Sequence, residues 1–276
     1  MSSLQRSLLL ISSSKVHGHE FLGHAVDDIN SLLKTASVKK VLFVPYALDN
    51  HDDYTARVTK PFSEWGFSLE GIHKAKDPIT AVNEAEAIFI GGEHSKEYTE
   101  KGEFISHTHT HVSVQATKPT WWRAHSVVRT ETARRVEGQD GVPYIGSSAG
   151  TNVATVNICT TNDMPIVYPP SFSALGLVHI QYQPTLLGPR PSLYAQRGEY
   201  DHSHHLMEET REERIHQYHE LPDTPPVLGL REGCVLKVTG NKAVLTGVIG
   251  ARLFTAGKTP EEFAVGADVS FLLKEN

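Results

Sequence analysis

Long apolar runs and clusters of basic residues are both missing from this chain of 276 residues. The N-terminal apolar run, residues 8–11, is far shorter than a secretory signal core or the roughly 18 residues of a membrane span. The formal charge is −6, from 26 basic and 32 acidic residues, and no stretch interleaves Lys or Arg with aromatic residues. A nucleic-acid surface needs such a stretch. We therefore expect a soluble protein without a membrane or nucleic-acid partner.

Cysteine is also scarce, with only Cys159 and Cys234 in the whole chain. Secreted proteins of small size often depend on several disulfides, whereas proteins of reducing compartments keep few, reduced thiols. The composition therefore predicts a cytoplasmic protein, and we expect both thiols to be buried rather than bridged.

Apolar strands alternate with amphipathic helices through the first third of the chain. Residues 8–11, 38–45, 67–73 and 87–90 have the continuous apolar character of strands buried on both faces, and each is followed by a helical pattern or a glycine turn. This alternation is typical of a doubly wound, mostly parallel α/β sheet, whose functional groups collect at the carboxyl ends of the strands. We expect one domain over residues 1–276, with Gly91, Gly92 and Ser148 as neighbours at that edge.

The later part of the chain has a different pattern. A strand is predicted at 177–182, a charged helix at 209–220 and a strand at 227–230. Short apolar pieces at 234–239, 243–248 and 252–255, separated by Gly and Asn, then predict an antiparallel C-terminal β extension.

Two segments, near 93–139 and 183–208, lack a clear period and are interpreted as irregular inserts. In the first, His107, His109 and His111 alternate with Thr and could share one face of a strand. No acidic or Cys partner stands at ligand spacing, so a solvated loop is preferred to a metal site.

The most informative stretch is Gly146-Ser147-Ser148-Ala149-Gly150, which matches G-x-S-x-G after a short apolar strand. On a sharp strand-to-helix turn, the central Ser lifts its hydroxyl off the sheet edge, and the next backbone N–H faces a developing oxyanion. Ser148 is therefore the candidate nucleophile, and the Ala149 N–H a candidate oxyanion donor. A Gly/Ser-rich turn without chemistry is the alternative.

The run Thr160-Thr161-Asn162-Asp163-Met164-Pro165-Ile166 is a more discriminating motif than the G-x-S-x-G pattern. Other informative stretches are Val44-Pro45-Tyr46-Ala47, Gly71-Ile72-His73, Asp77-Pro78, Ile90-Gly91-Gly92, residues 144–152, residues 209–215 and Gly229-Leu230-Arg231-Glu232-Gly233. In these stretches the chain resembles peptidase E, the α-aspartyl dipeptidase family of serine peptidases.

The resemblance implies a flavodoxin-like fold, related to class I glutamine amidotransferases, and cleavage of Asp-X dipeptides without metal or cofactor. It makes Ser148 the nucleophile and assigns the acidic positions to Asp163 and Glu232. It places Gly91, Gly92 and Ala149 at the oxyanion and substrate site. We expect a monomer or homodimer acting on a small acidic dipeptide. Without the resemblance, Asp163 also suits a turn cap and Glu232 a solvated turn.

Three departures from the family pattern concern the chemistry. Thr185 stands where the family has its catalytic His, and a threonine hydroxyl cannot accept a proton near neutral pH. Glu93 follows Gly91-Gly92 where the family has a third Gly, and a carboxylate there would oppose an oxyanion. Cys159 replaces an Arg that would suit an acidic substrate.

Two functions are compatible with these departures. A working serine dipeptidase would take its base from His179, His202, His204 or His205. A catalytically impaired homologue would instead keep the pocket and bind an acidic small molecule. An amidotransferase-like or cyanophycinase-like hydrolase is a further alternative, disfavoured by residues 160–166 and by the serine at the elbow.

Overall fold

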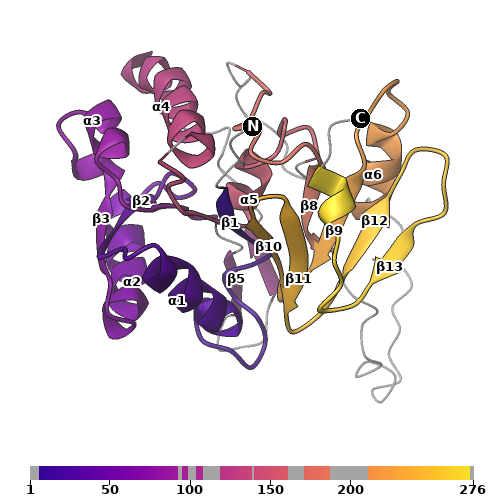
Figure 1. The fold of residues 1–276 in the computed structure, drawn as a ribbon, viewed down its shortest axis with the longest axis horizontal. Coiled ribbons are helices and arrows are strands. Elements are labelled where there is room, and N and C mark those ends of the chain that lie inside the picture. Colours follow the sequence, from indigo (N-terminus) through magenta and orange to yellow (C-terminus); the bar gives the residue numbers. More distant parts are fainter. Residues whose placement is uncertain are drawn as a thin grey trace.

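The computed structural model describes residues 6–92, 95–98, 104–107, 119–138, 140–160, 171–186 and 211–273. Its main sheet has seven strands in the order β11-β10-β1-β7-β4-β2-β3 (Figure 1). The last five strands in this order are parallel, whereas β10 and β11 are antiparallel. The predicted fold class is thus confirmed. The strands are β1 (Ser7–Ile11), β2 (Lys40–Val44), β3 (Ser68–Gly71), β4 (Ile88–Ile90), β7 (Tyr144–Ser147), β10 (Cys234–Thr239) and β11 (Lys242–Gly247).

Both faces of this sheet are buried because side chains alternate along each strand. Leu9 and Ile11 of β1 pack with the residues of α1 and α2, whereas Leu8 and Leu10 belong to the core on the opposite face. That second core includes Val82 of α3 and Val136 of α4. The helices are η1 (Gly23–Ala25), α1 (Val26–Thr35), α2 (His51–Glu64), η2 (Ile72–Lys74), α3 (Pro78–Asn83), α4 (Pro119–Glu137) and α5 (Ala149–Val153).

A second sheet of four strands has the order β13-β12-β9-β8 and lies at the end of the molecule opposite β3 and α3 (Figure 1). Ile215 and Tyr218 of α6 pack on it against Val227 and Phe254. The predicted C-terminal antiparallel pieces are therefore confirmed, although they divide between the two sheets. The remaining elements are β5 (Ser95–Tyr98), β6 (Phe104–His107), β8 (Gln181–Leu186), α6 (Arg211–Tyr218), β9 (Val227–Arg231), β12 (Ala251–Phe254), β13 (Glu261–Phe263) and η4 (Ser270–Leu273).

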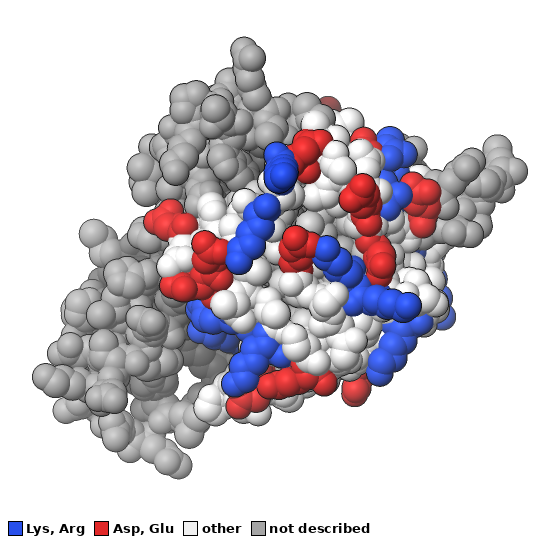
Figure 2. All heavy atoms as spheres, turned by 90° about the vertical axis from the view of Figure 1, so that its left-hand side faces the viewer, with Lys and Arg blue, Asp and Glu red and all other residues white. Residues whose placement is uncertain are grey.

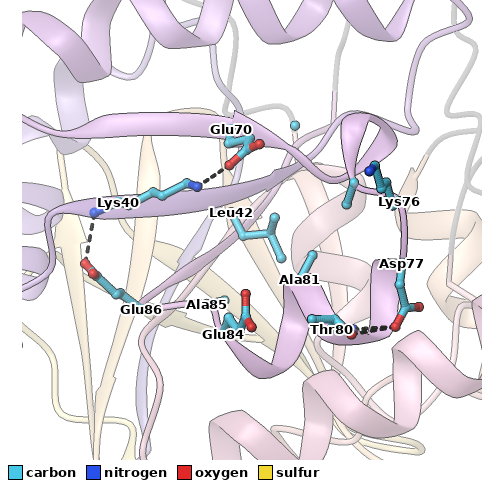
Figure 3. Close-up of a pocket in the computed structure, with 12 residues that line it drawn as sticks. Lys40, Leu42, Glu70, Lys76, Asp77, Thr80, Ala81, Glu84, Ala85 and Glu86 are labelled. Atoms are coloured by element: carbon cyan, nitrogen blue, oxygen red, sulfur yellow. Dashed lines mark hydrogen bonds and ion pairs between the residues drawn. The ribbon is translucent and has the colours of Figure 1, made fainter.

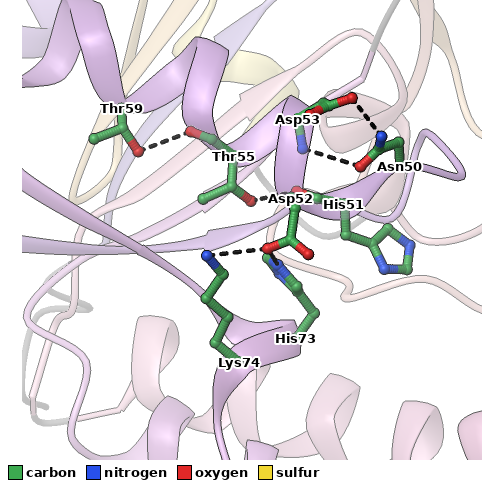
Figure 4. A network of polar contacts seen from close by, with 8 residues as sticks. All are labelled: Asn50, His51, Asp52, Asp53, Thr55, Thr59, His73 and Lys74. Carbon is green, nitrogen blue, oxygen red and sulfur yellow. Dashed lines mark hydrogen bonds and ion pairs between the residues drawn. The ribbon is translucent and has the colours of Figure 1, made fainter.

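Polar contacts fix the loops that follow β2 and β3 (Figure 4). Asn50 caps α2 by accepting a hydrogen bond from the Asp53 N–H at 3.0 Å. Asp52 lies 3.3 Å from His73 Nε2 and 3.0 Å from Lys74 Nζ, so the first turn of α2 is joined to η2. These bonds, led by Lys74, lower the pKa of Asp52. The two loops are thereby held together at the carboxyl edge of the sheet.

The prediction of a solvated loop over residues 93–139 was wrong for the part that the structure describes. Residues 95–98 and 104–107 form the hairpin of β5 and β6, and α4 covers residues 119–137. Val128, Thr132 and Val136 fall on one helical stripe, and the latter two are buried. The polar Thr at the middle position of this stripe hid the period. His107 ends β6, whereas His109 and His111 lie outside the described residues.

The strand predicted at 177–182 is displaced towards the C-terminus, because β8 begins at Gln181. Leu177 and Val178 are fully buried but not extended in a ladder. The Val178 N–H instead donates to the Ala154 carbonyl at 3.3 Å, and the Arg6 guanidinium donates to the Leu177 carbonyl at 2.9 Å. The apolar run therefore reflects burial beneath the end of α5, which periodicity alone cannot distinguish from a strand.

The surface charges and the two cysteines can be compared with what the composition predicts. Figure 2 shows Lys and Arg interspersed with Asp and Glu on the face at the β3 and α3 end of the molecule. Cys159 and Cys234 are both free, as expected; Cys234 is buried, but Cys159 is exposed, which corrects the prediction for that thiol. Among the described residues, no helix has the length and apolar character needed to cross a membrane.

His24, in η1, is an imidazole that the fold keeps neutral. Neither of its ring nitrogens, both buried, has a hydrogen-bond partner in the described part of the chain. Burial, together with the nearby ring of His19, lowers the pKa of His24 from 6.5 to about 4. The unfolded chain therefore takes up a proton between these pH values that the folded protein does not.

We expect the free energy of unfolding to be unaffected by His24 above pH 6.5 and to decrease as the pH falls from 6.5 towards 4. The loss from this residue should be on the order of 2 kcal/mol, reduced by its partial exposure. Urea unfolding at several pH values would show it, and His24→Gln should flatten this part of the profile. The exposed His216, replaced in the same way, is the control. Identical profiles for His24→Gln and the wild-type protein would contradict the expectation.

Candidate functional site

The carboxyl ends of β1, β7, β4, β2 and β3 meet at one edge of the main sheet, because these strands are parallel. Ser148 follows β7 directly, and Gly91 follows the adjacent β4. The expected proximity of the glycine pair and the serine is confirmed by the contacts described below. The edge therefore gathers backbone and side chains that are far apart in the sequence.

Ser148 has an unusual backbone conformation, with φ 51° and ψ −110°. A residue other than glycine held in such a sparsely populated conformation costs on the order of 1–3 kcal/mol, and residues strained in this way cluster at functional sites. Ser148 precedes the first residue of α5, a position where a Ser side chain commonly caps the helix, yet its hydroxyl makes no cap hydrogen bond. The turn thus presents a hydroxyl that helix formation does not use, as the G-x-S-x-G pattern predicts.

The two glycines of the motif are required by close packing within the elbow. A Cβ at Gly146 would lie 2.7 Å from the Gly150 carbonyl oxygen, and one at Gly150 would lie 2.0 Å from the Ile90 carbonyl oxygen. The Tyr144 hydroxyl also donates to the Gly150 carbonyl at 2.6 Å. Burial raises the pKa of Tyr144, which keeps it a donor. The sharp turn is therefore wedged between β7 and β4.

Gly92 faces the amide that follows the serine. A Cβ on Gly92 would lie 2.4 Å from the Ala149 nitrogen and 2.6 Å from the Ser147 carbonyl oxygen. The Ala149 N–H is the first of α5, so it has no partner within the helix. A side chain at position 92 would therefore collide with this amide, the donor predicted to face an oxyanion. Gly91 is packed just as tightly, since its Cβ would lie 2.4 Å from Tyr54 Oη.

Glu232 lies in the turn between β9 and β10, and β10 pairs with β1 next to β7. The following Gly233 donates its N–H to Ser12 Oγ at 2.9 Å, at the carboxyl end of β1. The Glu232 side chain is partly exposed and makes no hydrogen bond or ion pair with the residues described. The fold thus brings this carboxylate to the same edge as Ser148, separated from it by one strand.

Other predicted site residues are not placed there. Asp163 lies outside the described residues, as do His202, His204 and His205. His179 is exposed and precedes the amino end of β8, beside Ala154 at the end of α5 that is remote from Ser148. Thr185 is near the carboxyl end of β8, whose neighbour β9 leads into Glu232. No described imidazole forms a hydrogen bond with Ser148.

Sequence reasoning missed the loop that follows β1. The His19 N–H donates to the Val16 carbonyl at 3.0 Å, and Gly18 has φ +80°, so the chain makes a tight turn that carries His17. Val16 lies beside Gly233: a Cβ added to Gly233 would be 3.4 Å from Val16 Cγ1. Two imidazoles, His17 and His19, are thus brought to the carboxyl edge next to the Glu232 turn. The apolar run at residues 8–11, followed by Gly18, is the sequence pattern that could have indicated this turn.

A hollow elsewhere on the molecule does not belong to this site. A cavity of about 340 Å³ lies between α3 and the strands β2 and β3 (Figure 3). The Lys40 ammonium pairs with Glu70 at its wall, and the Asp77 carboxylate accepts a hydrogen bond from the Thr80 hydroxyl at 2.6 Å. Its lining contains no residue of the serine elbow.

Comparison with known proteins agrees with this geometry. The sequence profile of Peptidase family S51 matches residues 8–97 and 122–246. The chain belongs to this family. A Drosophila melanogaster protein named probable alpha-aspartyl dipeptidase is 44% identical over 273 residues, covering 98% of each chain. A Streptomyces coelicolor protein named peptidase E is 42% identical, covering 97% of this chain and 95% of that protein.

A solved structure also has the same fold. The crystal structure of a peptidase from an acI-B1 Actinobacterium aligns with a TM-score of 0.60, over 98% of this chain and 99% of the other. At 14% sequence identity, this similarity concerns the fold alone. The resemblance to this family inferred from the motifs of the chain is confirmed.

The close packing of the elbow predicts that Gly150→Ala is strongly destabilising. The new Cβ would lie 2.0 Å from the Ile90 carbonyl oxygen, so the backbone of β4 or α5 must shift. We expect a loss of at least about 2 kcal/mol in urea unfolding. Gly23→Ala is the matched control, because its Cβ would meet only ordinary contacts at 3.7 and 3.8 Å. Equal effects of the two substitutions would show that the elbow tolerates a side chain.

Proposed function

We propose that this S51 protein is a serine-type dipeptidase that hydrolyses dipeptides with an N-terminal aspartate. The single observation that carries the proposal is the strained Ser148, whose hydroxyl caps no helix and whose neighbouring Ala149 N–H, the first of α5, lies beside Gly92. The names of relatives over 40% identical along nearly the whole chain support the aspartyl dipeptide as substrate.

In the proposed reaction, Ser148 Oγ attacks the carbonyl carbon of the aspartyl residue and passes its proton to a base. The Ala149 N–H, with the Gly91-Gly92 backbone beside it, stabilises the negative carbonyl oxygen of the tetrahedral intermediate. The peptide C–N bond then breaks, and the leaving amine takes the proton from the base. Water hydrolyses the resulting ester and releases aspartate. Asp163 and Glu232 are the carboxylates proposed to orient and stabilise the protonated base.

We further propose that residues 1–276 act as one domain in the cytoplasm. The turn that carries Glu232 joins strand β9 of one sheet to strand β10 of the other, so the proposed site depends on both sheets. The two free cysteines, Cys159 and Cys234, suit a reducing compartment. No cofactor takes part in the proposed reaction.

The first test is release of aspartate from Asp-Leu by the purified protein, compared with Ala-Leu. We expect turnover of Asp-Leu and little turnover of Ala-Leu, and Ser148→Ala should lower kcat by roughly 10⁴-fold or more. Amino-acid analysis of the products is sufficient. Thermal stabilisation by aspartate without turnover would instead support the impaired, binding-only homologue.

A proton acceptor is the group that the proposal still needs, because Thr185 cannot serve and His179 lies at the wrong end of β8. We infer an imidazole from one of two sources. One is His17 and His19 of the loop after β1; the other is His202, His204 and His205.

Replacing each set with Gln separates the two sources, and each set is the control for the other. The set that contains the base should lose roughly 10³-fold in kcat and also the activity change near the pKa of histidine. Steady-state rates on Asp-Leu between pH 5 and 8 would measure both effects. Full activity in both variants would contradict an imidazole base from either segment.

A further inference from the structure

The turn that carries Glu232 is fixed on both sides by its neighbours. Arg231 forms a bidentate ion pair with Glu262, in which Nη1 and Nη2 donate to the two carboxylate oxygens at 2.6 and 2.7 Å. Gly233 has φ +98°, which favours glycine, and its carbonyl accepts the Val248 N–H at 2.9 Å. The remaining group, the Gly233 N–H, donates to Ser12 Oγ at 2.9 Å. The contacts of these two neighbours thus hold the backbone on both sides of Glu232.

Ser12, which accepts the Gly233 N–H, directly follows β1, the strand whose last residue bonds the Ser148 backbone. Its side chain is fully buried, and its own N–H donates to the Cys234 carbonyl at 3.1 Å. The preceding residue, Ile11, accepts the Ser148 N–H at 3.0 Å. Ile11, the last residue of β1, therefore bonds the Ser148 backbone, and Ser12, which follows the strand, bonds the backbone beside Glu232.

We propose that Ser12 is a positioning residue for the reaction: its buried hydroxyl sets the place of Glu232 relative to Ser148. This inference rests on the proposed function, in which Glu232 supports the protonated base. Ser12 acts on Glu232 through its hydrogen bond with the Gly233 N–H, and not through contact with the substrate. A buried N–H without an acceptor is unfavourable, so loss of this hydroxyl should let the turn shift.

Ser12→Ala should lower kcat on Asp-Leu by roughly 10- to 100-fold, because small displacements of a catalytic group are costly in rate, with little change in KM. The same substitution made in a Glu232→Gln background should have less than about a twofold effect, since the group that Ser12 places is then already altered. An equal loss in both backgrounds would indicate a general structural role and would overturn the proposal.

Ser13→Ala is the matched control. Ser13 is also buried, but among the described residues its hydroxyl bonds only within its own loop, donating to the Lys15 carbonyl at 2.8 Å and accepting the Lys15 N–H at 3.2 Å. We expect near wild-type kcat for this variant. Ser12→Cys, almost the same size but a weaker acceptor, provides a second variant should the alanine protein fold poorly, and its kcat should fall between those of serine and alanine.

Hydrogen exchange separates this inference from the proposed function. In the full-length protein, the Gly233 amide should exchange faster in Ser12→Ala and Ser12→Cys than in the wild-type and Ser13→Ala proteins. Unchanged exchange at Gly233 would overturn the positioning role, even in an active enzyme. A wild-type protein that releases no aspartate would instead overturn the proposed function, and the exchange data would still decide whether Ser12 holds the turn.

Discussion

The carbonyl oxygen of Ile11 is the acceptor on which the proposed site depends. It receives the Ser148 N–H at 3.0 Å and the Thr151 hydroxyl at 2.8 Å, so the last residue of β1 holds both the strained serine and the first turn of α5. Thr151 also reaches the Gly146 carbonyl at 3.0 Å. These bonds are buried, where an unmade hydrogen bond is costly, and they stabilise a backbone conformation that serine alone would avoid.

The same strand explains how two sheets contribute to one edge. β1 pairs in parallel with β7 on one side and antiparallel with β10 on the other. The antiparallel neighbour turns the chain back, so the turn before β10 arrives at the carboxyl end of β1. Glu232 comes to the edge for this reason, although its preceding strand β9 belongs to the second sheet. The topology therefore brings the Glu232 turn to this edge, and the hydrogen bond from the Gly233 N–H to Ser12 Oγ joins that turn to the end of β1.

How much of the fold and of the candidate site could be predicted depends on how far apart in the sequence the interacting residues lie. Local patterns were sufficient for the parallel strands and for the elbow at Ser148, because each depends on residues adjacent in sequence. Displacement of β8 and the presence of α4 were missed, since burial beneath α5 and a polar Thr132 on the buried stripe both disguise the period. The role of Ser12 could not be predicted, because its partner, Gly233, is 221 residues away.

The energetics of the elbow bear on whether its serine is used. At φ 51°, glycine would remove the strain, whereas serine costs on the order of 1–3 kcal/mol there. The Ser148 hydroxyl does not offset this cost by capping α5, and no described residue forms a hydrogen bond with it. The described interactions that hold the turn, from the bonds to the Ile11 carbonyl to the close packing of Gly92, do not use the Ser148 hydroxyl. Folding alone therefore gives no reason for serine at this position, and attack on a bound carbonyl does.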